Sequence, residues 1–261
     1  LLYDPKASNT VIVIVGDNGS LGSAVKLPFQ LDRAKGTAYQ TGVWDPLIIA
    51  GPQVVQPDRE VGHMVNTVDL FQFFGEVAGI DVHKAVPRTV DSVGILPYLT
   101  HPEQPSLRTI NFAMGGFNQQ PNGTRNGPCV VNTSCTQIPV SKSVCEDNQG
   151  VWWGAGYSDA SVVVNRGQGY PSCGAVNQAL HRASRPPFNI LPEISTAIRN
   201  DKHKLIENTV QTYDPATDAI GTLVTEELYE INQAKPTPLL DTADRNLLPA
   251  ATPEIRAIYD D

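Results

Sequence analysis

The stretch Thr10-Val11-Ile12-Val13-Ile14-Val15-Gly16-Asp17-Asn18-Gly19 is a run of β-branched residues that stops abruptly at a glycine, an acid and an amide. Such a continuous apolar run with turn residues behind it predicts a strand buried on both faces, as in the parallel core of an α/β protein. Asn-Gly also favours a hairpin turn, but the residues that follow do not repeat a matching strand. We therefore expect Asp17 and Asn18 at the carboxyl end of a buried strand, the edge where ligands bind in open α/β sheets.

Asp17 and Asn18 are candidate metal ligands. Asp17 supplies a hard carboxylate and Asn18 a neutral carbonyl oxygen, the ligand types that Ca²⁺ or Mg²⁺ prefers. Because Ca²⁺ takes roughly six to eight oxygens, two residues cannot complete a site. On these residues alone, a plain turn or helix cap is the simpler interpretation.

Further segments follow the Asp-Asn-Gly strand in a fixed order. They are Lys35-Gly36-Thr37-Ala38-Tyr39-Gln40-Thr41-Gly42-Val43-Trp44-Asp45-Pro46-Leu47, then Val65-Asn66-Thr67-Val68-Asp69-Leu70, then Asn200 to Ile206, and finally Glu226-Glu227-Leu228-Tyr229-Glu230-Ile231-Asn232. This succession resembles the second half of the sulfatase family, in the alkaline phosphatase superfamily. There a strand ending in Asp-Asn-Gly precedes a Lys-Gly-x-x-Tyr-x-x-Gly-Val-x-x-Pro-Leu segment, a helix beginning near Val-Asp-Leu and a closing Glu-Leu-Tyr-Asp-Leu segment. The similarity runs along most of the chain outside the stretch from about residue 115 to about residue 190.

The resemblance implies roles for three residues. Asp17 and Asn18 match two ligands of a divalent cation, Ca²⁺ or alternatively Mg²⁺, and Lys35 matches the catalytic lysine that contacts the anionic oxygens of the substrate. In such enzymes the cation polarises a sulfuryl or phosphoryl oxygen, and lysines stabilise negative charge on the transferring group. On composition alone, Lys35 would be an ordinary surface lysine.

The nucleophile motif of the family is absent. No Cys/Ser-x-Pro-x-Arg pentapeptide, in which the Cys or Ser becomes formylglycine, occurs in the chain, and Ser184-Arg185-Pro186-Pro187 has the wrong spacing. The remaining acidic ligands and the leaving-group His and Lys belong to the family's N-terminal half. We therefore expect a sulfuric ester hydrolase fragment that is inactive alone. Its partner would be an N-terminal half bearing formylglycine, either a separate chain or a lost part of the precursor, and its substrate a sulfate ester.

The resemblance also implies a fold class and a division of the chain. The expected fold is α/β, with residues 1–114 forming the C-terminal part of an alkaline phosphatase-like mixed sheet flanked by helices. Residues 115–190 would form a cysteine-bearing insertion, and residues 191–261 a small antiparallel C-terminal sheet ending in a helix.

Several local elements follow from the pattern of apolar residues. Apolar spacings of three and four predict an amphipathic helix over 67–78, in which Phe71, Phe73 and Phe74 lie in or near the core and Asp69 stabilises the N-terminus. Strands are expected at 42–50 and 107–114. The family resemblance implies two further short strands, at 194–199 and 204–206, in the C-terminal sheet.

The cysteines favour an oxidising compartment. All four, Cys129, Cys135, Cys145 and Cys173, lie in one stretch rich in Asn, Gly, Pro and Ser. An even number in such a stretch predicts two disulfides, with the pairing left open, and a secreted or periplasmic location. A zinc site is less favoured because no Cys-x-x-Cys spacing is present.

Glycosylation sequons occur in the same stretch, at Asn122-Gly123-Thr124 and Asn132-Thr133-Ser134. They indicate a glycoprotein if the source is a eukaryote. Asn18-Gly19-Ser20 also fits the pattern, but we expect it to be buried.

Composition removes two classes of partner. The 261 residues carry a formal charge of -8, without a Lys/Arg cluster, so nucleic acid is not an expected partner. No apolar window is long enough for a membrane span, and no signal-peptide pattern is present.

The missing initial Met, just before a predicted buried strand, indicates a processed or truncated chain.

Two alternative functions remain open. Phosphate or phosphonate ester hydrolysis suits the same Asp-Asn pair and lysine, because fold does not settle chemistry. A non-catalytic extracellular binding module would use the insertion, where Trp152, Trp153 and Tyr157 form either an exposed aromatic platform or, as burial statistics favour, a small core. The five histidines match no nucleophile motif and are expected to be structural.

Overall fold

The computed structural model describes residues 4–21, 24–116, 127–138, 142–147, 149–156, 168–232 and 239–260. Within them the chain is a mixed α/β structure with three antiparallel or mixed sheets and two disulfides. The strands are β1 (Ile12–Val15), β2 (Leu47–Ala50), β3 (Asn111–Gly115), β4 (Gly127–Val131), β5 (Ser134–Ile138), β6 (Val151–Trp152), β7 (Asn189–Ile190), β8 (Ile194–Arg199), β9 (His203–Asp214) and β10 (Ala219–Glu230). The helices are α1 (Pro5–Ser8), α2 (Gln40–Val43), α3 (Asp69–Val77), α4 (Val82–Ala85), α5 (Leu96–Thr100), α6 (Lys142–Asp147), α7 (Cys173–Arg182) and α8 (Pro253–Asp260), with short 3-10 turns η2 (Leu31–Arg33), η3 (Ala243–Arg245) and η4 (Leu248–Ala250).

The strand that opens the chain is present but not in the predicted setting. β1 pairs antiparallel with β2, with Ile14 opposite Ile48, and the two form a ribbon of their own. The prediction of a strand buried on both faces in a parallel core is therefore wrong for the described residues. Ile14 is 58% exposed and Ile48 is 57% exposed, because only the opposite face of the ribbon is covered.

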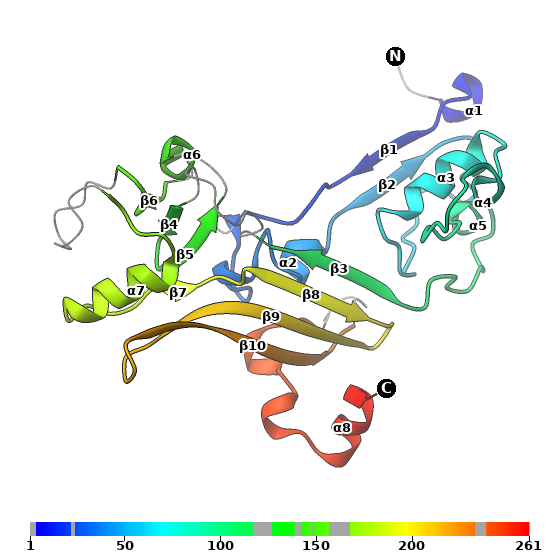
Figure 1. The fold of residues 1–261 in the computed structure, drawn as a ribbon. Helices are drawn as coiled ribbons and strands as arrows, with labels where there is room; N and C mark the ends of the chain where they lie inside the picture. Colours follow the sequence, from blue (N-terminus) through cyan, green and yellow to red (C-terminus); the bar gives the residue numbers. More distant parts are fainter. Residues whose placement is uncertain are drawn as a thin grey trace.

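The covered face of the ribbon packs on the helical layer. Alternate residues of β1 and β2 contact a cluster built around Phe73, Ile95, Tyr98 and Leu99, from α3 and the α5 region. Figure 1 shows the ribbon running alongside α3, α4 and α5, away from the other sheets. Alternation along each strand thus sorts its side chains into a packed face and an open one.

Helix α3 confirms the predicted amphipathic helix, with one qualification. Phe73 is 1% exposed, but Phe71 and Phe74 are 51% and 52% exposed, so only one of the three aromatic side chains lies in the core. Asp69, the first residue of α3, is fully buried and pairs with Arg108. Its oxygens also accept hydrogen bonds from the backbone, at 2.8 Å from Asn66 N, so the structural role predicted for Asp69 is confirmed.

A four-stranded antiparallel sheet in the order β10-β9-β8-β3 forms the middle of the molecule. β8 matches the predicted strand at 194–199, whereas β9 and β10 form a hairpin of two 12-residue strands that is longer than predicted. The strand predicted at 107–114 appears as β3, which pairs with β8 across a large separation in sequence.

One face of this sheet is covered by the segment that contains Lys35. Ala38 and Tyr39 pack there against Ala197, Ile206 and Tyr229 in a compact core. The chain segment from η2 to α2 therefore packs on this sheet (Figure 1). The predicted strand over 42–50 is split, because Gln40–Val43 forms α2 before β2 begins.

The cysteine-bearing region forms a third sheet in the order β6-β4-β5-β7, with α7 beside it. Disulfides join Cys129 to Cys145 and Cys135 to Cys173, which confirms two bridges and supplies the pairing. Trp152 and Trp153 are 6% and 2% exposed, so they form a small core as favoured. Tyr157 and the sequon at 122–124 lie outside the described residues.

Helix α8 confirms the predicted C-terminal helix and packs near β10, where Tyr259 donates a hydrogen bond to Glu226 at 2.8 Å. In the described part of the chain, every helix is too short or too polar to cross a membrane.

Candidate functional site

The two motif-bearing segments are joined through their backbones. Gly19 N donates to Gly42 O and Ser20 N donates to Thr41 O, both at 2.9 Å. Lys35 N in turn donates to Ser20 O at 2.9 Å. The loop that follows β1 is thus fixed against the segment from Lys35 to α2, and the three predicted site residues belong to one corner of the fold.

Close packing explains the glycines of this corner. A Cβ added at Gly19 would collide with the backbone of Thr41 and Gly42, and one at Gly42 would collide with Thr37 O. Only residues without a side chain allow the two segments to approach so closely. The Asp-Asn-Gly and Gly-Val motifs therefore have a packing reason that does not depend on any chemistry.

Asp17 and Asn18 are exposed, and Lys35 is partly exposed. The expectation that the Asn18 sequon would be buried is therefore wrong, because Asn18 and Ser20 are exposed and Gly19 is only partly covered. None of the three residues is buried, so each has some contact with solvent.

The structure adds Asp45 to this corner, as a third charged residue beside Asp17 and Lys35. Its Cβ lies where a side chain on Gly16 would be, so Asp45 sits directly against the end of β1. Burial raises the pKa of the Asp45 carboxyl, the nearby Asp17 carboxylate raises it further, and Lys35 lowers it. Sequence reasoning missed Asp45. Its only signal was its place between Trp44 and Pro46 in the lysine segment.

The described residues offer a partial ligand set for a hard cation. Asp17 and Asn18 provide oxygen donors, the type that fits Ca²⁺ or Mg²⁺, and Asp45 adds a second carboxylate nearby. Within the same residues there is no group of three or more His, Cys, Asp or Glu side chains that could hold a metal ion. The residues thus fit part of such a site, and further ligands would have to come from elsewhere.

Arg33 anchors the start of the lysine segment to the central sheet. Its guanidinium donates to Tyr229 Oη at 2.7 Å and pairs with Glu227 at 3.1 Å, and it lies 4.2 Å above the centre of the Tyr39 ring. Tyr39 Oη donates to Glu227 at 2.6 Å. Burial raises the pKa of Tyr39 and of Tyr229 well above the ordinary value, so both phenols stay protonated.

Asp241 anchors the other end of the segment. Its carboxylate accepts hydrogen bonds from Gln40 N at 2.8 Å and from Lys204 Nζ at 2.7 Å, while its backbone N donates to Gln40 Oε1 at 3.0 Å. Its backbone oxygen also accepts from Arg33 at 2.9 Å. One residue of the C-terminal segment therefore contacts residues on both sides of Lys35.

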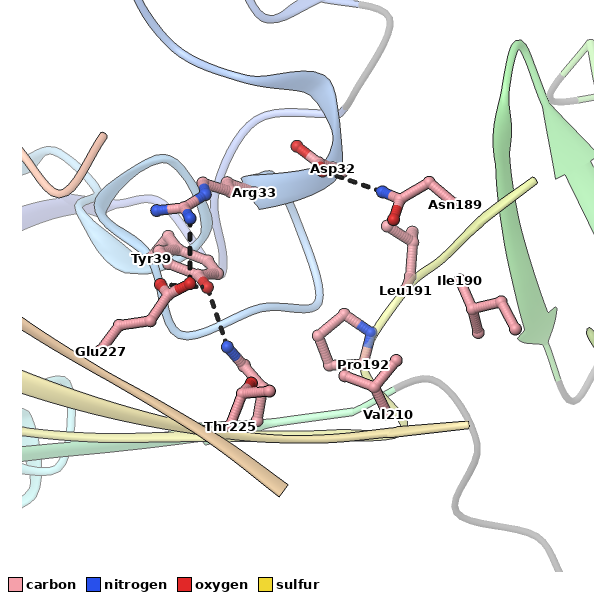
Figure 2. A pocket seen from close by; sticks show the side chains of 11 residues that line it. Asp32, Arg33, Tyr39, Asn189, Ile190, Leu191, Pro192, Val210, Thr225 and Glu227 are labelled. Carbon is pink, nitrogen blue, oxygen red and sulfur yellow. Dashed lines mark hydrogen bonds and ion pairs between the residues drawn. The ribbon is translucent and has the colours of Figure 1, made fainter. Parts of the chain in front are cut away.

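A small pocket of about 160 Å³ opens beside this network. It lies between the η2 region, the segment after β7 and the β9–β10 hairpin (Figure 2). Asp32 reaches across its rim, where its carboxylate accepts a hydrogen bond from Asn189 at 2.9 Å. None of the sequence-predicted site residues lines it.

Two of the histidines pack against tyrosine rings. His63 stacks on Tyr98 with ring centroids 5.0 Å apart, and His181 lies 5.5 Å from the ring of Tyr213. These contacts agree with the prediction that the histidines are structural.

Comparison with known proteins gives a partial similarity. The chain is similar to a curated protein named Sulfatase from Formosa agariphila, with 31% identity over 103 residues. Those residues are 39% of this chain and 18% of the relative, so the chain matches less than a fifth of that protein's length. No protein-family model and no solved structure matches the chain. The similarity supports a sulfatase-like relationship for part of the chain and leaves the alkaline phosphatase-like details of the fold as a prediction.

Proposed function

We propose that this chain is the C-terminal portion of a metal-dependent sulfatase and is inactive without an N-terminal half. In the complete enzyme Asp17 and Asn18 supply some of the ligands of the divalent cation, Ca²⁺ or alternatively Mg²⁺. Lys35 stabilises negative charge on the sulfuryl group. The reaction of the whole enzyme is hydrolysis of a sulfate ester through formylglycine supplied by the other half.

One observation carries this proposal: the loop that follows Asp17 and Asn18 is hydrogen-bonded through its backbone to the Lys35 segment, and none of the three side chains is buried. A hard cation held by oxygen ligands polarises a sulfuryl oxygen. A lysine beside it stabilises the charge that develops during transfer, which is usually the largest contribution to catalysis. The partial similarity to a protein named Sulfatase adds independent support.

The two anchors give Lys35 a fixed base. Arg33 and Gln40, which flank it, are tied by Glu227 and Asp241 to buried parts of the sheet. A preorganised charge stabilises a transition state better than a mobile one, because its orientation costs nothing at the moment of reaction. The backbone of Lys35 thus lies between two residues that are anchored to the rest of the fold.

We also propose that the protein is secreted or periplasmic. The two disulfides are typical of proteins that fold in oxidising compartments. Asn132, in the turn between β4 and β5, is exposed and available for glycosylation in a eukaryotic source.

The first test is peptide mass spectrometry on the protein purified from its natural source. A co-purifying chain or longer precursor with a Cys/Ser-x-Pro-x-Arg peptide in its formylglycine form would support the proposal. A Thr or unmodified Ser at that position would favour phosphate or phosphonate hydrolysis. If no second half exists, the enzyme proposal fails and a binding module is the better description.

The second test measures turnover of an aryl sulfate by the completed enzyme. Lys35→Ala should lower kcat by about 10²-fold or more, the usual loss when one charge-stabilising donor is removed. Asp17→Ala should remove the response to added Ca²⁺ or Mg²⁺. Lys26→Ala, on an exposed lysine outside the corner, is the matched control and should retain full activity. Equal activity of the Lys35 and Lys26 variants would contradict the assignment.

A further inference from the structure

In the described part of the chain, strand β10 is one edge of the central sheet, whose order is β10-β9-β8-β3. Its register with β9 runs without a break from Ala219 opposite Asp214 to Glu230 opposite His203, so the strand contains no β-bulge. The residues 219–224 are all exposed. Figure 1 shows β10 as the outermost strand of this sheet, so its first half presents a long, regular and open edge.

Hydrogen bonds at Leu228 show which residues of β10 turn their backbone groups outward. Leu228 N donates to Asn246 Oδ1 at 3.1 Å, and Leu228 O accepts from Leu247 N at 2.8 Å, so both groups point away from β9. Because the direction of these groups alternates along a strand, every second residue before Leu228 also points outward. These residues are Glu226, Val224, Thr222 and Ile220. Within the described ranges, their outward N–H and C=O groups have no backbone partner.

The sequence of this edge carries none of the usual protection. Natural edge strands are blunted by charged residues, proline or bulges, because an open row of N–H and C=O groups pairs readily with another strand. The segment Ala219-Ile220-Gly221-Thr222-Leu223-Val224-Thr225 contains no charged residue and no proline. Ile220, Leu223 and Val224 are 42%, 51% and 55% exposed. This uncharged, largely apolar edge favours pairing with a further strand.

The pattern of outward groups selects one register for pairing with a second copy. In an antiparallel pair, opposite residues exchange hydrogen bonds only where both turn their groups toward the partner. With Leu223 on a two-fold axis, Ile220 lies opposite Glu226 of the second copy, and Thr222 lies opposite Val224 of the second copy. All four outward residues then find partners. Leu223 meets its own counterpart in the closer, non-hydrogen-bonded kind of pair, which brings two exposed leucines together.

Shifts of this register are disfavoured. Moving the axis one residue toward the hairpin turn places Glu226 opposite Asp218 of the second copy, and like charges directly opposite each other destabilise a sheet. Moving it one residue the other way requires the outward groups of Leu228, which the C-terminal segment already occupies. The register centred on Leu223 avoids both costs.

The charges near the hairpin turn support the same register. Arg182 of α7 pairs with Asp218 at 2.5 Å, and its side chain is 61% exposed. Helix α7 packs on the side to which Ile220 points, because a Cβ on Gly174 would lie 2.6 Å from Ile220 Cγ2. Opposite residues place their side chains on the same face of a sheet. Glu226 of the second copy therefore brings a carboxylate to the side of the exposed guanidinium.

The opposite edge of the sheet is already partly covered. Phe112 O of β3 accepts a hydrogen bond from Asn66 Nδ2 at 3.1 Å, and Asn111 Nδ2 donates to Val65 O at 3.2 Å. The segment before α3 thus lies along β3. Pairing through β10 alone relates two copies by a two-fold axis, and such an interface closes at a dimer.

We propose that two copies of this chain associate through β10, antiparallel and centred on Leu223, so that one sheet continues across both. The proposal does not rest on the sulfatase chemistry, since the edge contains none of Asp17, Asn18 and Lys35. The partner is a second copy because the outward residues are complementary to themselves about this axis. A single strand pair is a small interface, so we expect a Kd on the order of 10–100 µM.

The test uses the full chain alone, with its disulfides intact and without divalent cations. Sedimentation velocity between about 1 and 300 µM should show a shift from monomer to dimer. Amide hydrogen exchange, followed by NMR at both ends of this range, locates the contact. We expect exchange at Thr222 and Val224 to slow about threefold or more at the high concentration. Exchange at Leu223, whose N–H points toward β9, should not change.

Val224→Lys places a charge in the middle of the pairing edge and should raise the Kd at least tenfold. Its matched control is Ile198→Lys, at a residue that is 45% exposed and lies on β8, inside the sheet, and this change should leave the Kd unaltered. Thr222→Pro is the second variant. It removes an outward N–H that β9 does not use, so the dimer should be lost while circular dichroism shows the fold retained.

Four results would overturn the proposal. One is a monomer at every concentration up to about 300 µM. Another is concentration-dependent protection confined to β1 and β2, which would place self-association on the open face of the ribbon. The third is an equal Kd for the Val224 and Ile198 variants. The fourth is growth beyond a dimer, which a two-fold interface does not allow.

Discussion

Lys204 and Asp241 form an ion pair in which each side chain is only 3% exposed. Burial lowers the pKa of Lys204, and the Asp241 carboxylate raises it again in part. A pair of this kind is costly to break, because the remaining ammonium is left in a poorly solvated position. Nothing in the sequence paired these two residues. They lie 37 positions apart, and although Lys204 falls in the segment from Asn200 to Ile206, no motif includes Asp241.

We expect Asp241→Ala to destabilise the chain by about 3–5 kcal/mol at neutral pH, the usual loss when one partner of a buried pair is removed. The same change releases Gln40 N, which the carboxylate accepts from. Urea unfolding monitored by circular dichroism gives the difference. A loss below about 1 kcal/mol would mean that water reaches Lys204 and that the pair is not a structural anchor.

The pH dependence of that variant has a definite sign. Without Asp241 the folded-state pKa of Lys204 falls further below its unfolded value, so between the two values the unfolded state binds more protons. Stability of the variant therefore rises as pH increases through this window, and the gap to the unchanged protein narrows toward pH 10. Lys204→Met in the Asp241→Leu background should recover most of the loss.

At the scale of elements, chain entropy distinguishes the two disulfides. The Cys135–Cys173 bridge, which ties β5 to α7, spans 38 residues, and the Cys129–Cys145 bridge spans 16. In the loop-closure description the longer bridge stabilises by about 4 kcal/mol and the shorter by about 3 kcal/mol.

We therefore expect the double variant Cys135→Ala/Cys173→Ala to lose more stability than Cys129→Ala/Cys145→Ala, by about 1 kcal/mol. Thermal and urea unfolding of the two variants under identical conditions measures the difference. The reverse order would show that packing around Trp152, which contacts the shorter bridge, outweighs chain entropy.

The sequence predicted elements whose signal is local. Helix α3 follows from its spacing of apolar residues, and β1 from its run of β-branched residues, because these patterns depend on near neighbours. The strand β8, with the sequence ISTAIR, has no such run and was expected only from the family resemblance. The pairing of β3 with β8 and the partners of the four cysteines depend on contacts far apart in sequence, which no local pattern encodes. Phe71 and Phe74 were misplaced because periodicity gives the apolar stripe of a helix but not how much of it is covered.

In the candidate site, too, the sequence revealed residues that belong to local motifs and missed residues that are defined by distant contacts. Asp17, Asn18 and Lys35 were found from ordered motifs, and the structure places their segments in contact. Asp45 and the anchors Arg33 and Asp241 were missed, because an isolated charged residue has no signal until its neighbours are known. Motifs thus located the corner, and tertiary contacts supplied what holds it in place.

The strand at the start of the chain was predicted correctly as a strand and wrongly as a buried one. In the described residues β1 pairs only with β2, and the ribbon has an open apolar face in which Ile14 and Ile48 are cross-strand neighbours. Exposed apolar residues in a contiguous group are costly in water and commonly mark an interface. Within the proposed function, the N-terminal half covers this face and so buries the strand as its sequence predicts.

On this argument Ile14→Ser leaves the isolated chain within about 0.5 kcal/mol of its original stability, since the side chain is already 58% exposed. The same change should weaken association with the N-terminal half by tenfold or more, because burying that side chain is worth about 1.5–3 kcal/mol. Leu223→Ser, at a similarly exposed apolar residue of β10, is the control and should leave association unchanged. Sedimentation of mixtures of the two halves measures the binding. Equal association of both variants would place the interface elsewhere and leave the open face of the ribbon without this partner.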